Sequence, residues 1–325
     1  MKTKYLTQSD SDLRAAAELL RLGQLVAFPT ETVFGLGACC YNEQAVARIF
    51  EAKERPLFDP LIVHISTLEM ALELWTEING NMLRLMERFW PGPLTIVAGK
   101  KDVVPDLVTA GLDTVAVRFP DHQVARRLIG FAGFPVAAPS ANRFGHVSPT
   151  RSEHVRDELS GRIAAIVEGE TKIGLESTVV RFVENRLLVL RPGGITVEEL
   201  KSEFPDTLLA DEFQQKYSPG HSTRHYAPEI PLILFSDAAD LKRLIRLTGI
   251  SPQDAAAIYF REALIPEIDK FLILSHAGDL SEAAAGLFPA LRHFKGKVCL
   301  FAQKVPEHGL GLAINDRLRR AAGGK

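Results

Sequence analysis

Two spacings of apolar residues alternate along the first part of the chain. Leu13, Ala16 and Leu20 recur at helical intervals and predict a helix over residues 11–23. The short apolar run 25–28, closed by Pro29, predicts a buried strand. The same reasoning predicts a helix over 42–53 and further strands over 61–65, 95–98, 114–117, 136–138, 164–167, 178–182 and 187–190. This region is predicted to be one α/β domain built on a large, open mixed sheet.

The periodicity fades between Pro205 and Pro231, where residues 217–228 have the composition of turns. Alternation then resumes, with predicted strands over 232–235, 256–260, 271–274 and 298–302 and helices over 238–247 and 280–294. Such βαβ alternation favours a small, largely parallel, Rossmann-like sheet. The predicted organisation is a domain over 1–205, a linker over 206–230 and a smaller C-terminal α/β domain over 231–325.

Composition supports folded domains and removes several classes of partner. A chain of 325 residues exceeds the size at which one core usually keeps growing, so two domains are expected. A net charge of −2 gives no bulk attraction to nucleic acids or membranes. The apolar runs are too short to span a bilayer, so no membrane partner is expected. Three cysteines without C-x-x-C spacing fit a reducing, cytoplasmic compartment.

Two cations follow the predicted helix over 42–53. Lys53 and Arg55 stand two apart where the chain turns into a loop, and a point charge beside a guanidinium fork could bind a triphosphate. A solvated helix end would look the same, because basic residues favour last turns. The motif alone leaves both interpretations open.

Two further candidates lie in or at the end of predicted strands. His64 interrupts the apolar run 61–65, where a lone histidine is often a structural core residue. Arg118 closes the strand before Phe119-Pro120, and a charged residue there either points into a ligand crevice or forms a surface ion pair.

Hydroxyl, amide and basic side chains recur where other predicted strands end or begin. They include Ser140, Asn142, Ser148, Ser177 and Arg191. Each could belong to an ordinary turn or cap. Their recurrence at several strand ends is typical of an anionic small-molecule site in an open α/β sheet. The sequence contains no P-loop, dinucleotide fingerprint, nucleophile elbow or H-E-x-x-H helix, which disfavours the common nucleotide and hydrolase scaffolds.

Taken in order, these segments closely resemble the YrdC family. The resemblance is carried by Phe28-Pro-Thr-Glu-Thr-Val-Phe-Gly-Leu-Gly37, Lys53-Glu-Arg-Pro56, Pro60-Leu-Ile-Val-His-Ile65, Phe89-Trp-Pro-Gly-Pro-Leu-Thr95, Val117-Arg-Phe-Pro120, Ala138-Pro-Ser-Ala-Asn142, Glu176-Ser-Thr-Val179 and Arg191-Pro-Gly193. Ser218-Pro-Gly220, His225-Tyr-Ala-Pro228 and the following α/β domain resemble the longer, two-domain members of that family. The resemblance implies a YrdC-like twisted open mixed sheet.

The resemblance also implies a reaction, synthesis of L-threonylcarbamoyladenylate from L-threonine, bicarbonate and ATP with release of pyrophosphate. Magnesium would accompany ATP. Such chemistry needs positioning and charge stabilisation more than a covalent nucleophile. The implied threonine contacts are Thr32, His64, Arg118, Ala138 and Ser177. The implied ATP contacts are Lys53, Arg55, Asp59, Thr114, Ser140, Asn142, Ser148, Arg191 and Tyr226, with Lys53 and Arg55 as catalytic residues and Tyr226 as a lid over the nucleotide.

This sequence departs from the family pattern at three places. Phe34 stands where tyrosine is frequent, which removes one hydroxyl, and Ser222 and Thr223 lie where a basic residue and a tyrosine are frequent. Asp59 stands where asparagine is frequent. An additional anion beside ATP would favour a metal or water bridge.

The family further implies a partner, a transferase complex that places the threonylcarbamoyl group on tRNA next to the anticodon. Two alternatives use the same cationic cleft. A protein that binds double-stranded RNA or a ribosomal precursor would bind less tightly as salt rises. A carbamoyl transferase would form carbamoyl-AMP from carbamoyl phosphate and ATP without bicarbonate. Weak direct binding of tRNA is compatible with the enzymatic interpretation.

Overall fold

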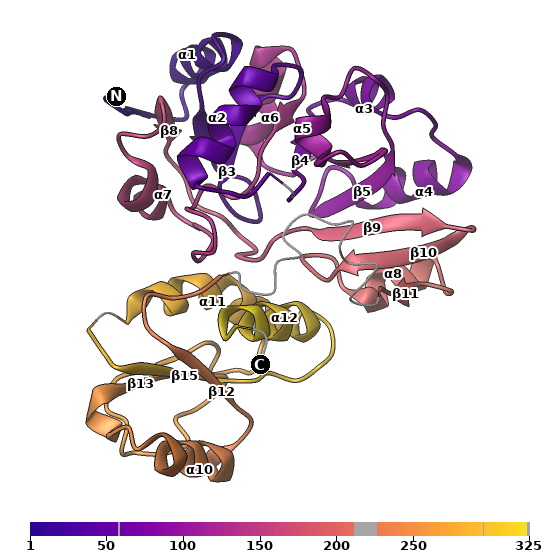
Figure 1. The fold of residues 1–325 in the computed structure, drawn as a ribbon. Helices are drawn as coiled ribbons and strands as arrows, with labels where there is room; N and C mark the ends of the chain where they lie inside the picture. The colour runs from indigo at the N-terminus through magenta and orange to yellow at the C-terminus, as the bar shows by residue number, and fades with distance from the viewer. Residues whose placement is uncertain (58, 211–225, 295, 324–325) are drawn as a thin grey trace. The chain divides into compact units, whose positions relative to one another are not determined.

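The chain forms two compact units in the computed structural model, which describes residues 1–57, 59–210, 226–294 and 296–323 (Figure 1). The first unit comprises Met1–Phe144, Ser148–Lys172 and Glu176–His221. The second comprises Ser222–Lys325 together with the short segments Gly145–Val147 and Ile173–Leu175. Two pieces of the N-terminal part of the sequence therefore belong, by their contacts, to the C-terminal unit.

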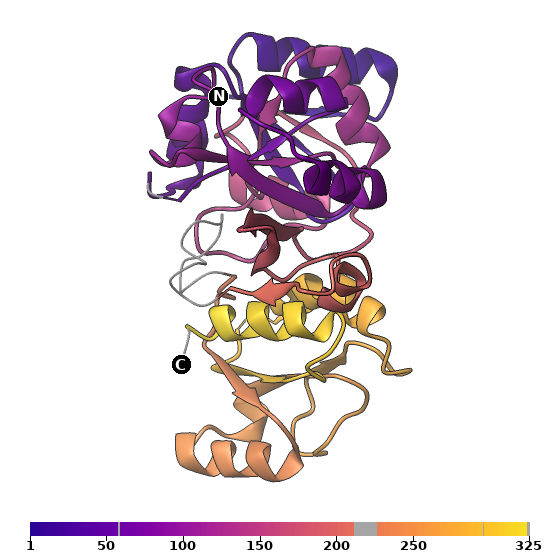
Figure 2. The same ribbon diagram turned by 90° about the vertical axis from the view of Figure 1, so that its right-hand side faces the viewer.

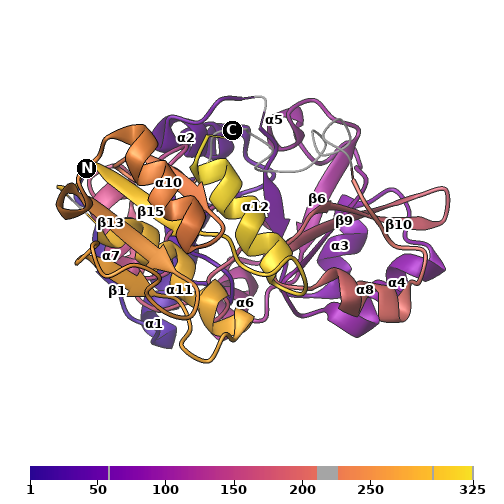
Figure 3. The same ribbon diagram turned by 90° about the horizontal axis from the view of Figure 1, so that it is seen from below.

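The first unit is built on an eleven-stranded mixed sheet with the strand order β1-β8-β2-β3-β7-β4-β6-β5-β9-β10-β11. Neighbours β4 and β6 are parallel, as are β5 and β9, whereas β5 and β6 run antiparallel. Figure 3 shows β9 and β10 side by side, which are antiparallel neighbours. The strands are β1 (Lys4–Leu6), β2 (Val26–Phe28), β3 (Gly35–Cys39), β4 (Ile62–His64), β5 (Leu94–Gly99), β6 (Thr114–Arg118), β7 (Val136–Ala137), β8 (Ala165–Val167), β9 (Thr178–Val183), β10 (Arg186–Arg191) and β11 (Leu208–Leu209).

The helices of the first unit begin at polar caps that the sequence supplies. Ser9, Asn42 and Asn79 each accept a hydrogen bond from a backbone N–H of the first turn, and Thr196 forms a capping box with Glu199. These side chains bind backbone donors that would otherwise lack a partner within the helix. The helices are α1 (Asp10–Arg21), α2 (Glu43–Lys53), α3 (Leu68–Leu74), α4 (Gly80–Phe89), α5 (Asp106–Thr109), α6 (Gln123–Ala132), α7 (Ser152–Leu159) and α8 (Val197–Glu203).

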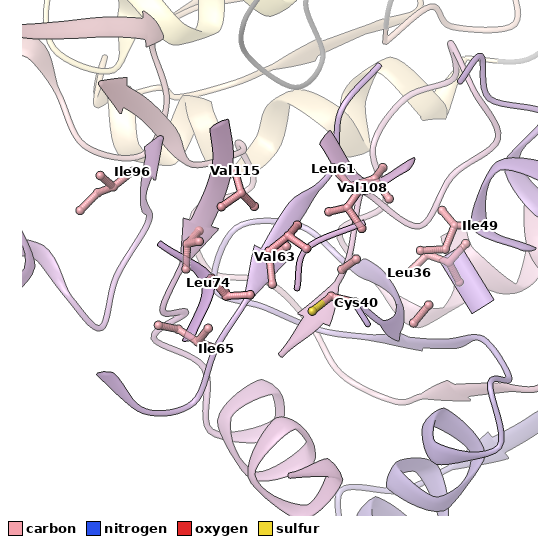
Figure 4. Close-up of a cluster of buried hydrophobic side chains, with 14 of the residues drawn as sticks. Leu36, Cys40, Ile49, Leu61, Val63, Ile65, Leu74, Ile96, Val108 and Val115 are labelled. Carbon is pink, nitrogen blue, oxygen red and sulfur yellow. The ribbon is translucent and has the colours of Figure 1, made fainter. Parts of the chain in front are cut away.

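Apolar side chains cover both faces of the sheet, as the short continuous apolar runs of the sequence predict. Alternate residues of β2 point to opposite faces: Ala27 joins the core that includes α2 and α4, and Phe28 joins the core that includes α1 and α6. Figure 4 shows the first of these cores, where Leu36 of β3, Ile49 of α2 and Val63 of β4 lie among other buried aliphatic side chains.

A smaller apolar cluster forms the floor beneath the predicted site. It contains Ile62 of β4, Val97 of β5, Ala116 of β6 and Val179 of β9. Side chains two apart on a strand share a face. Moving two positions along each strand, toward the same end of the sheet, therefore leads from this floor to side chains on the same face, which are His64, Thr95, Arg118 and Ser177. For the parallel strands β4 and β6 this is the carboxyl end, where open α/β sheets bind ligands.

The second unit contains a four-stranded, wholly parallel sheet of order β12-β15-β13-β14. Helices α11 and α12 cover one face of this sheet and α10 covers the other (Figures 1 and 2). The elements are β12 (Leu232–Phe235), α10 (Ala238–Thr248), a 3-10 turn (Pro252–Asp254), β13 (Ala255–Tyr259), β14 (Phe271–Ile273), α11 (Leu280–His293), β15 (Cys299–Gln303) and α12 (Gly311–Ala321).

The predicted fold class, a mixed α/β sheet followed by a small parallel α/β domain, is confirmed. Strands β1 and β3 and helices α3 to α8 and α12 fall outside the ranges predicted from the sequence. Strand β11 was also missed, and it pairs with β10 inside the range assigned to the linker. Glycines obscured β3, since glycine has low strand propensity. Gly37 is required there, because a Cβ would lie 2.8 Å from the ring of Phe28 and 2.9 Å from Val136.

We predict that Gly193→Ala destabilises the first unit by several kcal/mol. A Cβ at Gly193 would lie 2.3 Å from the carbonyl oxygen of Glu176 and 2.4 Å from the backbone of Ser177, which cannot move aside as a flexible side chain would. Gly80→Ala is the matched control, because nothing lies within 4 Å of the added carbon. Thermal unfolding of both variants measures the difference, and equal midpoints would contradict the close approach.

Candidate functional site

A buried guanidinium lies at the carboxyl end of β6. The side chain of Arg118 is 4% exposed; its Nη1 donates to the hydroxyl of Thr32 at 2.8 Å, and its Nη2 lies 2.7 Å from the carboxylate of Glu31. Thr30 shares a hydrogen bond with Thr32 and donates to the carbonyl of Val33, which fixes the turn between β2 and β3. The turn between β2 and β3 therefore supplies both the counter-charge and a hydrogen-bond acceptor for this arginine.

His64 lies directly opposite Arg118 in the pairing of β4 with β6. Its ring packs edge-on against Phe28, with 6.4 Å between ring centroids. Burial, together with the charge of Arg118, lowers the pKa of His64 from 6.5 to about 3. The imidazole is neutral at ordinary pH, and its Nδ1 has no hydrogen-bond partner among the residues that the structure describes. A neutral ring with an unused nitrogen suits a hydroxyl ligand.

Hydroxyl side chains also lie on the strands next to Arg118. Thr95 lies opposite Arg118 in the pairing of β5 with β6, and its hydroxyl hydrogen-bonds to that of Ser177 at 2.7 Å. Arg191 donates from Nη2 to the backbone carbonyl of Ser177 at 2.9 Å and to its hydroxyl at 3.3 Å. Hydrogen bonds thus join Thr32 to Arg118, and Thr95 to Ser177 and Arg191, and the pairing of β5 with β6 places these two groups side by side.

Lys53 holds the loop that follows β7. Its Nζ donates to the backbone carbonyls of Ser140, at 2.6 Å, and Asn142. Burial, with the nearby charge of Arg55, lowers the pKa of Lys53 well below its usual value. An ammonium has three N–H groups, so one remains for a ligand. Lys53 is therefore not a solvated helix end. The residue is only 1% exposed, and its side chain joins the end of α2 to the loop that follows β7.

Two further pairs complete the predicted ATP side. Arg55 and Asp59 form a buried ion pair of 2.8 Å, and Arg55 also donates to the carbonyl of Pro60 at 3.0 Å. Ser148 donates to the carboxylate of Glu176 at 2.6 Å. In each pair one side chain can donate hydrogen bonds to phosphate, and the other is a carboxylate whose negative charge would repel it.

The remaining predicted residues are less closely associated with this network. The backbone N–H of Ala138 donates to Ile62, which places it beside the strand that carries His64. Thr114 begins β6 at the end opposite Arg118. Tyr226 belongs to the second unit, where it stacks on Phe288. Its role as a lid stays a prediction, and the linker residues 211–225 lie outside the described part of the chain.

Sequence reasoning did not assign Glu31, Thr95 or Glu176 to the site. All three stand within the motifs that carried the resemblance. A signal for Thr95 exists only in the strand pairing, because it is 23 residues from Arg118 in sequence and directly opposite it in the sheet. Buried Glu31 and Glu176 were missed because an acidic residue in a turn usually faces solvent.

The described part of the chain has neither a metal-ligand cluster nor a membrane-spanning helix. Residues 1–57, 59–210, 226–294 and 296–323 contain no group of three or more His, Cys, Asp or Glu side chains placed to hold a metal ion. Within the same ranges, no helix is long and apolar enough to cross a bilayer.

The fold and this network of buried cations and hydroxyls define an α/β enzyme of the YrdC type. Residues 18–193 match the Sua5/YciO/YrdC family model, described as "Telomere recombination", and residues 195–323 match "Threonylcarbamoyl-AMP synthase, C-terminal domain". The chain belongs to the threonylcarbamoyl-AMP synthase family, whose members use ATP and transfer its adenylyl group. The resemblance and the enzyme class predicted from the motifs are confirmed.

Relatives match over nearly the whole length. The threonylcarbamoyl-AMP synthases of Bacillus subtilis and Pyrococcus abyssi are both 42% identical; the first match covers 99% of this chain and 96% of the relative, the second 96% and 94%. A crystal structure of the Pyrococcus abyssi Sua5 protein complexed with L-threonine superimposes with a TM-score of 0.91 at 39% identity, covering 100% of this chain and 98% of the other.

We predict that His64 makes the first unit less stable as pH falls. Because its pKa is lowered on folding, the unfolded chain binds the proton first, and stability is lost between about pH 6.5 and 3. The loss attributable to this group approaches about 1.4 kcal/mol per pH unit. His64→Gln should lack this component. Both tryptophans, Trp75 and Trp90, lie in the first unit, so their fluorescence in urea reports its unfolding.

The control for this prediction is His276→Gln, at an exposed position of the second unit. It should leave the pH dependence of the tryptophan signal unchanged. A wild type and a His64→Gln variant with parallel curves between pH 6.5 and 4 would show that His64 is not held neutral.

Proposed function

We propose that this chain converts L-threonine, bicarbonate and ATP to L-threonylcarbamoyladenylate and pyrophosphate. The observation that carries the proposal is the network at one edge of the sheet, where buried Arg118 lies between Thr32 and Thr95 and next to neutral His64. It offers a cation for a carboxylate and an uncharged ring for a hydroxyl, which are the two polar groups of threonine besides its amine.

The first step joins the nitrogen of threonine to the carbon of bicarbonate. The ammonium group first loses a proton to solvent, and the free amine then displaces water from bicarbonate, so that a C–N bond forms and a C–O bond breaks. Arg118 binds the threonine carboxylate, Thr32 and Ser177 supply hydroxyl contacts, His64 binds the side-chain hydroxyl, and the backbone of Ala138 borders the substrate. These groups contribute by holding the amine near the carbon, since orientation alone can supply several kcal/mol.

In the second step an oxygen of the carbamate attacks the α-phosphorus of ATP, and the bond to pyrophosphate breaks. Lys53 and Arg55 meet the phosphate charge, with Ser140, Asn142, Ser148 and Arg191 as further phosphate contacts. Asp59, Thr114 and Tyr226 complete the ATP side, and Tyr226 excludes water from the mixed anhydride. Magnesium would accompany ATP and would screen the phosphate charge.

The product is a reactive anhydride, which needs an acceptor. We infer that a transferase complex carries the threonylcarbamoyl group to the tRNA adenosine beside the anticodon. The names of the relatives support the first part of this inference, because they identify threonylcarbamoyl-AMP as the activated product. The acceptor is what the resemblance to the family implies. Weak direct binding of tRNA stays a prediction.

The reaction is tested by measuring pyrophosphate release with ATP and magnesium, adding and omitting threonine and bicarbonate in turn. We expect release that requires both co-substrates and magnesium, with threonylcarbamoyl-AMP detected by mass. Release without threonine would favour the carbamoyl transferase. No release under any condition would contradict the proposed reaction and favour nucleic-acid binding. That alternative is recognised by an affinity for RNA that falls as the salt concentration rises.

Lys53→Met tests the ATP side. Removing the ammonium abolishes a phosphate contact and leaves the carbonyls of Ser140 and Asn142 without their donor. We expect turnover to fall by more than about 100-fold and the free energy of unfolding to fall by about 1–3 kcal/mol. Lys101→Met is the matched control, because Lys101 also donates to a backbone carbonyl but is exposed. Full turnover in Lys53→Met would remove this residue from the site.

A further inference from the structure

Glu31 is a buried carboxylate to which the reaction described above gives no role. Its side chain is 5% exposed, and its Oε1 lies 2.7 Å from Nη2 of Arg118. Neither carboxylate oxygen accepts a well-directed hydrogen bond from any residue that the structure describes. The Nε of Arg118 likewise has no partner in that part of the chain. Both members of the pair therefore keep hydrogen-bonding capacity that burial makes costly to leave unused.

The position of Glu31 is set by its backbone. Its carbonyl oxygen accepts a hydrogen bond from the backbone N–H of Lys172, and the neighbouring Thr30 closes the turn on its other side. The carboxylate thus lies at a fixed place in the turn between β2 and β3. A group that is held in place without a saturated set of partners is suited to bind a ligand, because little reorganisation is needed.

The charges of the pair match those of a free amino acid. An α-amino acid carries a carboxylate and an ammonium on one carbon, and Arg118 and Glu31 present a cation and an anion in contact with each other. His64 is neutral, so the pair is balanced before a ligand arrives. A zwitterion placed head to tail against it would leave every charge with an opposite neighbour, which a low-dielectric site requires.

We propose that Glu31 binds the α-ammonium group of threonine while Arg118 binds its carboxylate. The inference rests on the proposed function and adds to it the residue that distinguishes an amino acid from a hydroxy acid. Ammonium–carboxylate hydrogen bonds are among the stronger ones in proteins, so recognition by this pair should be large enough to measure directly.

The test compares two ligands that differ only in the amine. L-Threonine and (R)-3-hydroxybutanoate share the carboxylate, the methyl group and the hydroxyl. We expect the wild type to bind L-threonine about 10- to 100-fold more tightly, and Glu31→Gln to reduce that ratio to about 1. Dissociation constants are measured by calorimetry with the full chain. Comparing ratios removes any loss that both ligands suffer because Arg118 has shifted.

Two further variants keep the test informative. Glu170→Gln makes the same charge change at an exposed neighbouring position and should leave the ratio at the wild-type value. If Glu31→Gln fails to fold because Arg118 loses its counter-charge, Glu31→Asp keeps the charge and shortens the side chain, so the ratio should still fall.

The outcomes separate this inference from the proposed function. An equal loss of affinity for both ligands, or an unchanged ratio in every Glu31 variant, would show that Glu31 supports Arg118 without touching the amine. A wild type that bound no L-threonine would overturn the proposed function itself. Selective loss of L-threonine binding supports both.

Discussion

Burial of the Arg118 charge is the constraint on which the site depends. A guanidinium removed from water is stable only with a counter-charge and hydrogen-bond acceptors close by. Glu31 provides the charge and Thr32 an acceptor, and both come from the turn between β2 and β3. The arginine comes from β6, four strands away in the order β2-β3-β7-β4-β6. The ion pair therefore holds a loop from one part of the sheet over strand ends from another.

The sheet makes this placement possible through its period of two. Val97 and Ala116 belong to the apolar floor on one face of the sheet. Two positions along the same strands, Thr95 and Arg118 lie on that same face. Strand pairing then fixes which of them meet. A slip of one residue would exchange the apolar and polar sets, so the register is held by the same core that supports the site.

Local patterns predicted most of the strands and the helices α1, α2, α10 and α11, because apolar runs and spacings are local properties. The pairing of Thr95 with Arg118 is not local, and neither is the contact between Lys53 and the loop at Ser140. The sequence placed Lys53 at a helix end but could not show that its ammonium holds two distant carbonyls. Strand β3 was missed for a local reason, since Gly35 and Gly37 are present for close packing, which lowers apparent strand propensity.

Charge balance differs between the two sides of the proposed site. On the proposed threonine side Arg118 is matched by Glu31, and His64 is neutral. On the proposed ATP side Arg55 is already matched by Asp59, at a position where the resemblance leads us to expect asparagine. An incoming triphosphate would therefore meet a neutralised arginine here, unless Asp59 turns to a magnesium ion that the nucleotide carries. Such an exchange would release the guanidinium for phosphate and give Asp59 a cation. On the proposed function, aspartate in place of asparagine would thereby couple nucleotide binding to the metal.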